Sequence, residues 1–328
     1  MRTAVSFSVV LLLVLGCSSS TDAPAADSVF SWKEVTPCPL PRFEAHGVVV
    51  DGELWVMGGF KSSDLEVTKS IDIYDPNGDR WRPGPELRGA ETHAGVVSLG
   101  RDFVMVGGFE GNVYNRISSA SVWRWNATDA TWSSGPDLPT PRSAVFAGLI
   151  GNELHAAGGL GPDGNTDSAE HVVWDLAGSA QWGVAAPLPN ARNHGGGASS
   201  KGRLFAVSGR HDWDEVAGDD PALDAFDPAT DSWSSRAPMP LPRSEIGGAT
   251  VTLADDRLLV VGGSVPGKAP SADVLLYDPQ KDSWSTLPSL PLPLKGVVAA
   301  RIGQKVIVST GSPTSIEPTD KTYVGCCL

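Results

Sequence analysis

Arginine, glutamate and histidine recur at two fixed positions behind a regularly spaced tryptophan. The tenth residue after each tryptophan gives the series Arg42, Glu91, Arg142, Arg192, Arg243 and Leu294. The twelfth gives the series Glu44, His93, Ala144, His194, Glu245 and Gly296. Guanidinium groups bind carboxylates or phosphates through paired hydrogen bonds, and a glutamate beside a histidine can transfer a proton. If the fold brings these positions together, the spacing predicts an anion-binding site or an acid–base pair.

Six tryptophans set this register, and their spacing indicates a repeat. They are 49, 51, 50, 51 and 51 residues apart: Trp32, Trp81, Trp132, Trp182, Trp233 and Trp284. A glycine follows each by 27 residues, or by 30 after Trp233: Gly59, Gly108, Gly159, Gly209, Gly263 and Gly311. A unit of about fifty residues is too small to bury its own hydrophobic face, so it must stack on its neighbours. The sequence therefore predicts one domain built from six similar units.

Each unit has the pattern of four short β-strands. In the first unit, residues 47–50 and 53–57 are apolar segments joined by Asp51-Gly52, a pair that favours a two-residue hairpin turn. Residues 70–74 and 80–82 supply two further strands. We therefore expect an all-β fold of four-stranded antiparallel blades.

The two ends of the repeat complete each other. Trp32 lacks the first half of its own unit, whereas Tyr323 has no tryptophan after it. We expect the N-terminal strand to complete the last blade and close a six-bladed propeller over residues 29–325.

These residues resemble the kelch family of β-propellers. The resemblance rests on Met57-Gly58-Gly59, Tyr74-Asp75, Trp81 and the Leu-Pro-x-Pro-Arg motif at residues 138–142. Kelch propellers include protein-binding modules, a copper oxidase and a sialic acid epimerase. The resemblance therefore implies the fold and leaves the function open. The matching blades lack the Tyr and Cys pair of galactose oxidase relatives.

The N-terminus resembles a bacterial lipoprotein signal. Arg2 and an apolar run over residues 4–15 precede Gly16-Cys17. The resemblance implies a signal peptide at residues 1–16, acylation of Cys17, and a flexible tether at residues 17–28. Ser18 resembles the sorting residue of outer-membrane lipoproteins, so we expect a bacterial cell-envelope protein that is lipid-anchored in the outer membrane. The alternative is an ordinary secretory signal in which Cys17 has no role.

The amino-acid composition limits the classes of partner that the protein can bind. A formal net charge of −13 argues against binding to nucleic acid, because phosphate backbones are bound by clustered cations. We expect a monomer.

Cys38 follows a fourth strand and the tail residues Cys326 and Cys327 follow a third, so they lie at opposite ends of the blade and no disulfide between them is expected.

The candidate binding surface is the face formed by the loops after each second strand and the segments before each first strand. We expect Phe60 and Phe109 to be exposed there. The arginines either pair with neighbouring carboxylates such as Glu44 and Glu245 or bind a ligand. The candidate partner-binding residues are Arg42, Glu44, His93, Arg142, Arg192, His194, Arg210, Trp213, Arg243 and Glu245.

The function expected from this surface is non-catalytic binding of a protein, peptide or glycan, with no cofactor. The alternative is a sialic acid epimerase or mutarotase in which Glu44 with His93, or Glu245 with His194, transfers protons beside an arginine clamp. Two histidines and two glutamates could also ligate zinc, but we expect the two pairs on opposite sides of a channel. Residues 163–167 begin like a calcium loop without its later glycine and glutamate.

Overall fold

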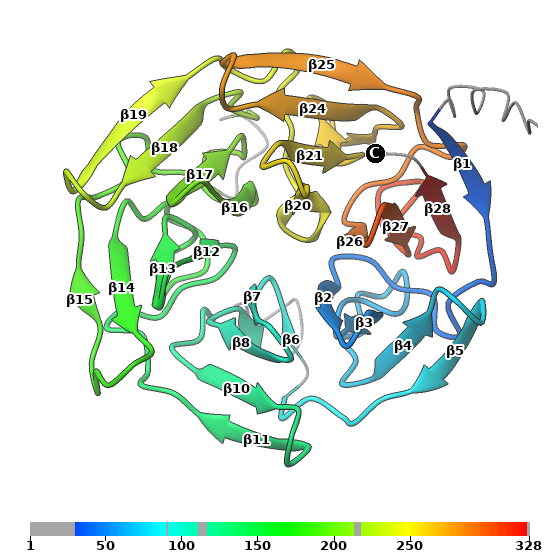
Figure 1. Ribbon diagram of the computed structural model, residues 1–328, viewed down its shortest axis with the longest axis horizontal. Coiled ribbons are helices and arrows are strands. Elements are labelled where there is room, and N and C mark those ends of the chain that lie inside the picture. Colours follow the sequence, from blue (N-terminus) through cyan, green and yellow to red (C-terminus); the bar gives the residue numbers. More distant parts are fainter. Residues whose placement is uncertain (1–29, 90, 111–116, 213–217, 327–328) are drawn as a thin grey trace, which may run out of the picture.

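The computed structural model describes residues 30–89, 91–110, 117–212 and 218–326. Figure 1 shows six four-stranded antiparallel sheets arranged as wedges around a central axis, which confirms the predicted propeller. In each blade the first strand lies nearest the axis and the fourth lies on the rim (Figure 1).

Blades 1 to 3 follow one another along the chain. Blade 1 consists of β2 (His46–Val50), β3 (Glu53–Met57), β4 (Ile71–Asp75) and β5 (Arg80–Pro83). Blade 2 consists of β7 (Gly95–Leu99), β8 (Asp102–Val106), β10 (Val122–Asn126) and β11 (Thr131–Ser134). Blade 3 consists of β12 (Phe146–Ile150), β13 (Glu153–Ala157), β14 (His171–Asp175) and β15 (Gly183–Val184).

Blades 4 to 6 complete the ring. Blade 4 consists of β16 (Gly196–Ser200), β17 (Arg203–Val207), β18 (Leu223–Asp227) and β19 (Ser232–Arg236). Blade 5 consists of β20 (Thr250–Thr252), β21 (Leu258–Val261), β24 (Val274–Asp278) and β25 (Ser283–Leu287). Blade 6 consists of β26 (Val298–Ile302), β27 (Lys305–Ser309), β28 (Thr322–Cys326) and β1 (Ser31–Glu34).

Short elements lie beside the blades. Strand β6 (Glu91–Thr92) pairs with β9 (Phe109–Glu110), and β22 (Ser264–Val265) pairs with β23 (Ala269–Pro270). A single turn of 3-10 helix, η2 (Gly247–Ala249), precedes β20. Within the described ranges, no helix is long and apolar enough to cross a lipid bilayer.

The hairpin between β2 and β3 shows why this sequence forms strands. Asp51 and Gly52 have φ values of 51° and 79°, which a two-residue turn of the expected type requires. Beyond the turn, Leu54, Val56 and Met57 have no exposed surface. These apolar side chains fill the space between neighbouring blades, which is where the hydrophobic core lies.

The repeated tryptophans tie each blade to the one before it. Trp81 Nε1 in blade 1 donates a hydrogen bond of 2.9 Å to the carbonyl of Thr36, which follows the rim strand of blade 6. The other five tryptophans make the same bond to the preceding blade, at 2.8 to 3.1 Å. An indole N–H that finds such an acceptor can be buried at little cost. The fixed spacing of the tryptophans therefore follows from a bond that every blade must make.

The ring closes through the two ends of the described chain, as the sequence predicts. Strand β1 pairs antiparallel with β28, and Trp32 lies opposite Gly325. Trp32 Nε1 donates to the carbonyl of Pro288 at 2.8 Å, so β1 is also tied to blade 5. The N-terminal strand is thus the rim strand of blade 6 (Figure 1).

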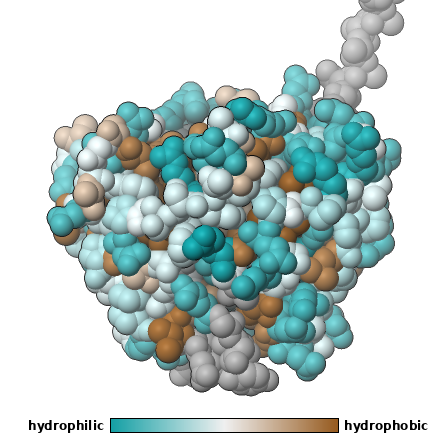
Figure 2. Space-filling model, turned by 90° about the horizontal axis from the view of Figure 1, so that it is seen from below, coloured by the Kyte–Doolittle hydropathy of each residue, from teal (hydrophilic) through white to brown (hydrophobic). Residues whose placement is uncertain are grey.

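The surface of the disc is largely hydrophilic. Figure 2 views the propeller edge-on, and hydrophilic residues dominate this side with small apolar areas between them. Cys38 is buried and Cys326 is exposed, and both are free thiols.

Candidate functional site

A small pocket lies on the axis where the inner strands begin. The lead-in segments of all six blades contribute to its wall, and the cavity is about 60 Å³. One water molecule needs roughly 10–15 Å³ by this measure, so the cavity holds only a few waters. Six of its lining residues occupy the same repeat position: Glu44, His93, Ala144, His194, Glu245 and Gly296.

The backbone explains how this position faces the axis. All six residues have a left-handed backbone conformation, with φ between 51° and 58°. This conformation turns the chain from the lead-in segment into the inner strand. It costs a non-glycine residue on the order of 1 kcal/mol. Five of the six residues are not glycine and adopt this conformation nonetheless. Contacts with the surrounding structure must therefore hold the backbone at this position.

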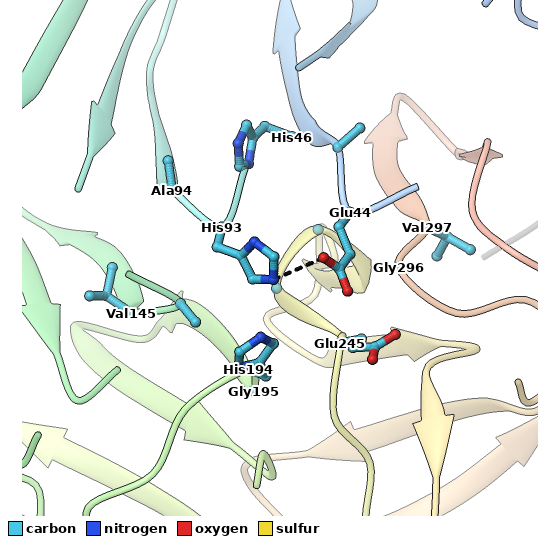
Figure 3. Close-up of a pocket in the computed structure, with 14 residues that line it drawn as sticks. Glu44, His46, His93, Ala94, Val145, His194, Gly195, Glu245, Gly296 and Val297 are labelled. Carbon is cyan, nitrogen blue, oxygen red and sulfur yellow. Dashed lines mark ion pairs between the residues drawn. The ribbon is translucent and has the colours of Figure 1, made fainter. Parts of the chain in front are cut away.

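Glu44 and His93 form the pair that the sequence predicts. Glu44 Oε2 lies 2.8 Å from His93 Nε2, and both side chains are nearly buried. Figure 3 shows the two side chains pointing toward each other from blades 1 and 2. The rings of Phe60 and Phe109 contact His93 at centroid distances of 6.1 and 5.0 Å. The imidazole is therefore caged by aromatic rings on one side and paired with a carboxylate on the other.

Glu245 and His194 are brought near each other, but they do not form a direct pair. Lys295 Nζ lies 3.1 Å from Glu245 Oε2, and Arg210 Nη1 lies 3.7 Å from Glu245 Oε1. Arg210 Nη2 also lies 2.9 Å from His194 Nε2. The guanidinium of Arg210 thus stands between the two residues. Arg210 is the one predicted arginine that joins the pocket network.

Lys295 was missing from the predicted site. Its side chain is 5% exposed and its ammonium group is held by Glu245. A signal was available, because Lys295 is the one charged residue at the eleventh position after a tryptophan, in the series Phe43, Thr92, Ser143, Asn193, Ser244 and Lys295. The single departure from an uncharged series marks it.

The two halves of the pocket meet, which corrects the prediction that they lie across an open channel. The rings of His93 and His194 are 4.8 Å apart. They come from blades 2 and 4, and blade 3 has the small Ala144 at the same repeat position. Among the described residues, no group of three or more histidine, cysteine, aspartate or glutamate side chains is arranged to hold a metal ion.

The buried charges shift the ionisation of the pocket. Burial alone would raise the pKa of Glu44, but its pairing with His93 and the charges of Lys295 and Arg210 outweigh burial and lower the pKa to about 2. Burial and the charge of Glu44 raise the pKa of Glu245. Burial, with the neighbouring charge of His93, lowers the pKa of His46 to about 3. At neutral pH, Glu44 is ionised and His46 is neutral.

The four repeated arginines are structural, which corrects the prediction that they are partner-binding residues on the loop face. Arg42, Arg142, Arg192 and Arg243 are 0–1% exposed. Each pairs with a carboxylate of its own blade, in the order Asp72, Glu170, Asp224 and Asp273, and none of these is the predicted Glu44 or Glu245. Each guanidinium also donates to carbonyls at the end of the second strand; Arg192 Nη2, for example, donates to Ala206 at 2.8 Å. The arginines therefore join strands within a blade.

The structure resolves one further expectation about this face. Phe60 and Phe109 are 5% exposed, so the prediction that they are exposed aromatics is wrong, because both pack around His93. Trp213 and Cys17 lie outside the described residues.

The segment that resembled a calcium loop forms a closed turn. Asp163 Oδ1 accepts hydrogen bonds from the backbone of Asn165 and Thr166 at 3.0 and 2.9 Å.

Asp167 lies 3.3 Å from His211 Nδ1, and His211 Nε2 lies 3.0 Å from Asp220. His211 therefore fastens the loop of blade 4 to the loop of blade 3.

Comparison with known proteins agrees with this architecture. Residues 41–88 and 247–291 match the Kelch motif. The chain is 30% identical over 244 residues to Kelch-like protein terF of Aspergillus terreus, which covers 72% of the chain and 52% of the relative. It is 27% identical to Kelch-like protein 35 of Mus musculus, over 82% of the chain and 43% of that protein. It is 22% identical to Alpha-scruin of Limulus polyphemus, over 87% of the chain and 32% of that protein.

The chain spans about half or less of the length of these relatives. The protein is therefore a six-bladed β-propeller that carries kelch motifs.

Proposed function

We propose that the protein is a non-catalytic binding module that holds a basic segment of a protein or peptide on the face around the central pocket. The similarity to Kelch-like proteins supports a binding propeller in general. The charges of the pocket support binding over turnover, because Glu44, Glu245, His93 and Lys295 are already engaged with one another. A cavity of about 60 Å³ also has too little room for a sugar ring.

The observation that carries this proposal is the charge of the loops between the second and third strands. In the described parts of these loops, six carboxylate side chains are exposed and two lysines are exposed. The carboxylates are Asp64, Glu66, Glu110, Asp163, Asp212 and Glu317, and the lysines are Lys69 and Lys268. An acidic ring on a rigid scaffold attracts a cationic partner and orients it.

The test compares two triple variants of equal charge change. The first neutralises the acidic face with Asp64→Asn, Glu66→Gln and Glu317→Gln. The control neutralises hairpins at the opposite end of the blades with Asp51→Asn, Asp129→Asn and Asp255→Asn. Each immobilised protein is exposed to an extract of the cells that make it, and the retained polypeptides are identified at several salt concentrations.

We expect the face variant to retain less of a lysine- or arginine-rich polypeptide than the parent, and the control to match the parent. Retention should fall as salt rises, because exposed ion pairs are screened. Equal loss in both variants, retention of a glycan instead of a polypeptide, or no retained partner would contradict the proposal.

A second candidate function rests on the contact between Glu44 and His93. At 2.8 Å this pair has the geometry of an acid and a base, and it could move a proton on a sugar only if the pocket opened beyond its volume of about 60 Å³. Proton NMR of anomer exchange with free sialic acid or an aldose tests it. Acceleration above buffer that Glu44→Gln abolishes would favour an epimerase or mutarotase and would displace the binding proposal.

We also propose that Cys17 carries a lipid anchor in a bacterial cell envelope. The support is the sequence of residues 2–17 alone, since the relatives named above are eukaryotic. Mass spectrometry of the mature N-terminal peptide tests it. Diacylglyceryl and acyl groups on Cys17 are expected, with loss of membrane association in Cys17→Ser; a free N-terminus elsewhere would contradict the anchor.

A further inference from the structure

A second cavity, of about 380 Å³, lies between blades 3 and 4. Its wall is formed by the start of β13, the end of β14, strand β15 and the hairpin between β18 and β19. Strand β15 lies on the rim (Figure 1). The segments lie at the end of the blades opposite to the central pocket, because β13 begins and β14 ends there. We call it the rim cavity, and its polar wall includes Glu153, His155, Asp175 and Asp231.

A missing side chain opens the rim cavity. Gly183 lies beside Val173 in the rim strand of blade 3. At the equivalent place in blade 1, Arg82 lies beside Ile73 and pairs with Glu53, the first residue of β3. Glu153 is the first residue of β13, so it is the counterpart of Glu53.

Blade 3 therefore keeps the carboxylate and lacks the cation. None of the described residues that line the rim cavity is lysine or arginine. Three carboxylates, from Glu153, Asp175 and Asp231, share the wall. Glu153 is half exposed, so it is open to a cation from outside.

Two histidines stand where other blades have apolar residues. His155 pairs with Val173 of β14, and the equivalent residues of the other second strands are Trp55, Val104, Phe205, Leu259 and Ile307. His171 is the first residue of β14, where four blades have Ile71, Val122, Leu223 and Val274. Both histidines are 1% exposed. Polar groups in such places destabilise a core unless their hydrogen bonds are made.

The hydrogen bonds of the two histidines determine which ring nitrogen of each carries the proton. His171 Nδ1 lies 3.0 Å from the carbonyl of Ala186, which can only accept, so Nδ1 donates. His155 Nδ1 lies 3.0 Å from His171 Nε2 and must donate to it. Burial lowers the pKa of each histidine to about 4, so both rings are neutral at pH 7. His155 Nε2 is then a bare acceptor, and this buried atom has no hydrogen-bond partner.

The bare acceptor faces the unpaired carboxylate. Glu153 Oε2 lies 3.9 Å from His155 Nε2, which is too long for a hydrogen bond between them. It is short enough for one nitrogen with two N–H bonds to donate to both. Phe226 lies against both histidine rings and closes the floor of the rim cavity.

We propose that the rim cavity binds an alkylguanidinium or alkylammonium group, whose N–H bonds are accepted by His155 Nε2 and Glu153. Asp175 and Asp231 contribute negative charge around it. The bound group supplies Glu153 with the positive charge that Arg82 supplies to Glu53 in blade 1. It comes either from an arginine or lysine side chain of another polypeptide or from a free small cation. Val184 at the rim, 85% exposed, would contact the chain that carries the group.

Histidine nitrogen NMR tests the proton arrangement before any ligand is added. Long-range proton–nitrogen spectra of protein labelled at histidine nitrogens should show both His155 and His171 with the proton on Nδ1. A proton on Nε2 of His155 at pH 7 would overturn the proposal, because the acceptor would then be absent.

Binding is tested with three probes: methylguanidinium, a blocked Gly-Arg-Gly peptide, and the same peptide with neutral citrulline in place of arginine. The guanidinium probes should shift the Nε2 signal of His155, and the citrulline peptide should not. Tighter binding of the arginine peptide than of methylguanidinium would identify a polypeptide side chain as the source. Equal binding would identify a free cation. No response to either guanidinium probe would overturn the proposal.

Variants separate binding from folding. Gly183→Arg restores the arrangement of blade 1 and should abolish probe binding, because the new guanidinium occupies the site. The backbone tolerates it, since a Cβ at Gly183 meets its nearest atom at 3.7 Å. Ser285→Arg, at the same strand position of blade 5, is the matched control and should bind as the parent does.

Removing the carboxylate of Glu153 gives a second test of guanidinium binding in the rim cavity. Glu153→Gln should weaken guanidinium binding by at least about threefold, as expected for a partly exposed charge-assisted contact. Glu53→Gln makes the same change where the carboxylate is already paired and should have no effect on binding. Binding that survives both Gly183→Arg and Glu153→Gln would overturn the proposal.

Discussion

Two glutamates at equivalent repeat positions behave differently because their neighbours differ. Glu44 has His93 at 2.8 Å, and the pKa of its carboxyl is lowered to about 2. The pKa of Glu245 is raised by burial and by the like charge of Glu44 nearby. The repeat supplies the position, and the individual partners set the ionisation of each carboxyl.

Glu44 should contribute to stability in a defined pH range. Its pKa is lower in the folded chain than the ordinary value of 4.5, so its stabilisation is present above pH 4.5 and is lost as pH falls toward 2. The shift corresponds to on the order of 3 kcal/mol. Glu44→Gln should flatten the acid limb of the unfolding free energy in that range, measured by urea unfolding, whereas the exposed Glu317→Gln should leave it unchanged.

The two histidines of blade 3 should change the stability of the fold at a higher pH than Glu44 does. Their folded-state pKa values are about 4 against an ordinary 6.5, so the unfolded chain takes up their protons first. Stability is then present above pH 6.5 and falls as pH drops through 6.5 toward 4.

The double variant His155→Phe with His171→Leu copies the residues of blade 4. It should remove this pH dependence, on the order of 3 kcal/mol for each histidine, and abolish probe binding in the rim cavity. Thermal unfolding from pH 4 to 8 checks it. A pH dependence equal to that of the parent would show that the two histidines ionise normally in the folded chain.

Within a blade, the recurring arginine acts as an internal brace. Arg192 pairs with Asp224 at 2.9 Å and donates to the carbonyls of Ala206 and Ser208. The guanidinium thereby joins the lead-in segment to the second and third strands. Its place is the same in four of the six blades, which is why the sequence shows it as a repeat.

Arg192→Ala should destabilise the propeller by about 3–5 kcal/mol, because it leaves Asp224 buried without its partner. The midpoint of urea unfolding measures the loss. Arg80→Ala, which removes an exposed guanidinium paired with Asp75, should shift the midpoint by much less. A small loss for Arg192→Ala would contradict the bracing role.

The sequence predicts the strands of a blade well and the positions of its charged side chains less well. Tryptophan spacing and the Asp51-Gly52 turn report local geometry, so the blades follow from them. Whether Arg142 points to the axis or into its blade depends on Glu170, 28 residues along the chain, and periodicity carries no signal of that pairing. Burial of Phe60 likewise depends on His93 of the next blade.

At the scale of the whole molecule, one short strand joins the two ends of the chain. Strand β1 makes four residue pairs with β28 and donates through Trp32 to blade 5. Closing a loop of this length costs entropy that grows only slowly with length, so a few strand pairs suffice. The prediction of closure from Trp32 and Tyr323 is confirmed because both residues belong to the repeat.

Deletion of residues 1–36 should lower the unfolding midpoint and expose the edge of β28, since blade 6 would keep three strands. Size-exclusion chromatography should then show self-association through that edge. Deletion of residues 1–28 is the control and should leave stability unchanged. Equal stability of the two truncated proteins would show that β1 does not hold the ring.

The cycle of tryptophan bonds has a consequence for how the six units can change. Open arrays of repeats need specialised end units with polar outer faces. Here every unit has a neighbour on both sides, so none is constrained to serve as a cap. Each is free to vary the residue that it sends to the axis, and the six do so, from the bare Gly296 to the charged Glu44. Sixfold architecture thereby supports an asymmetric centre.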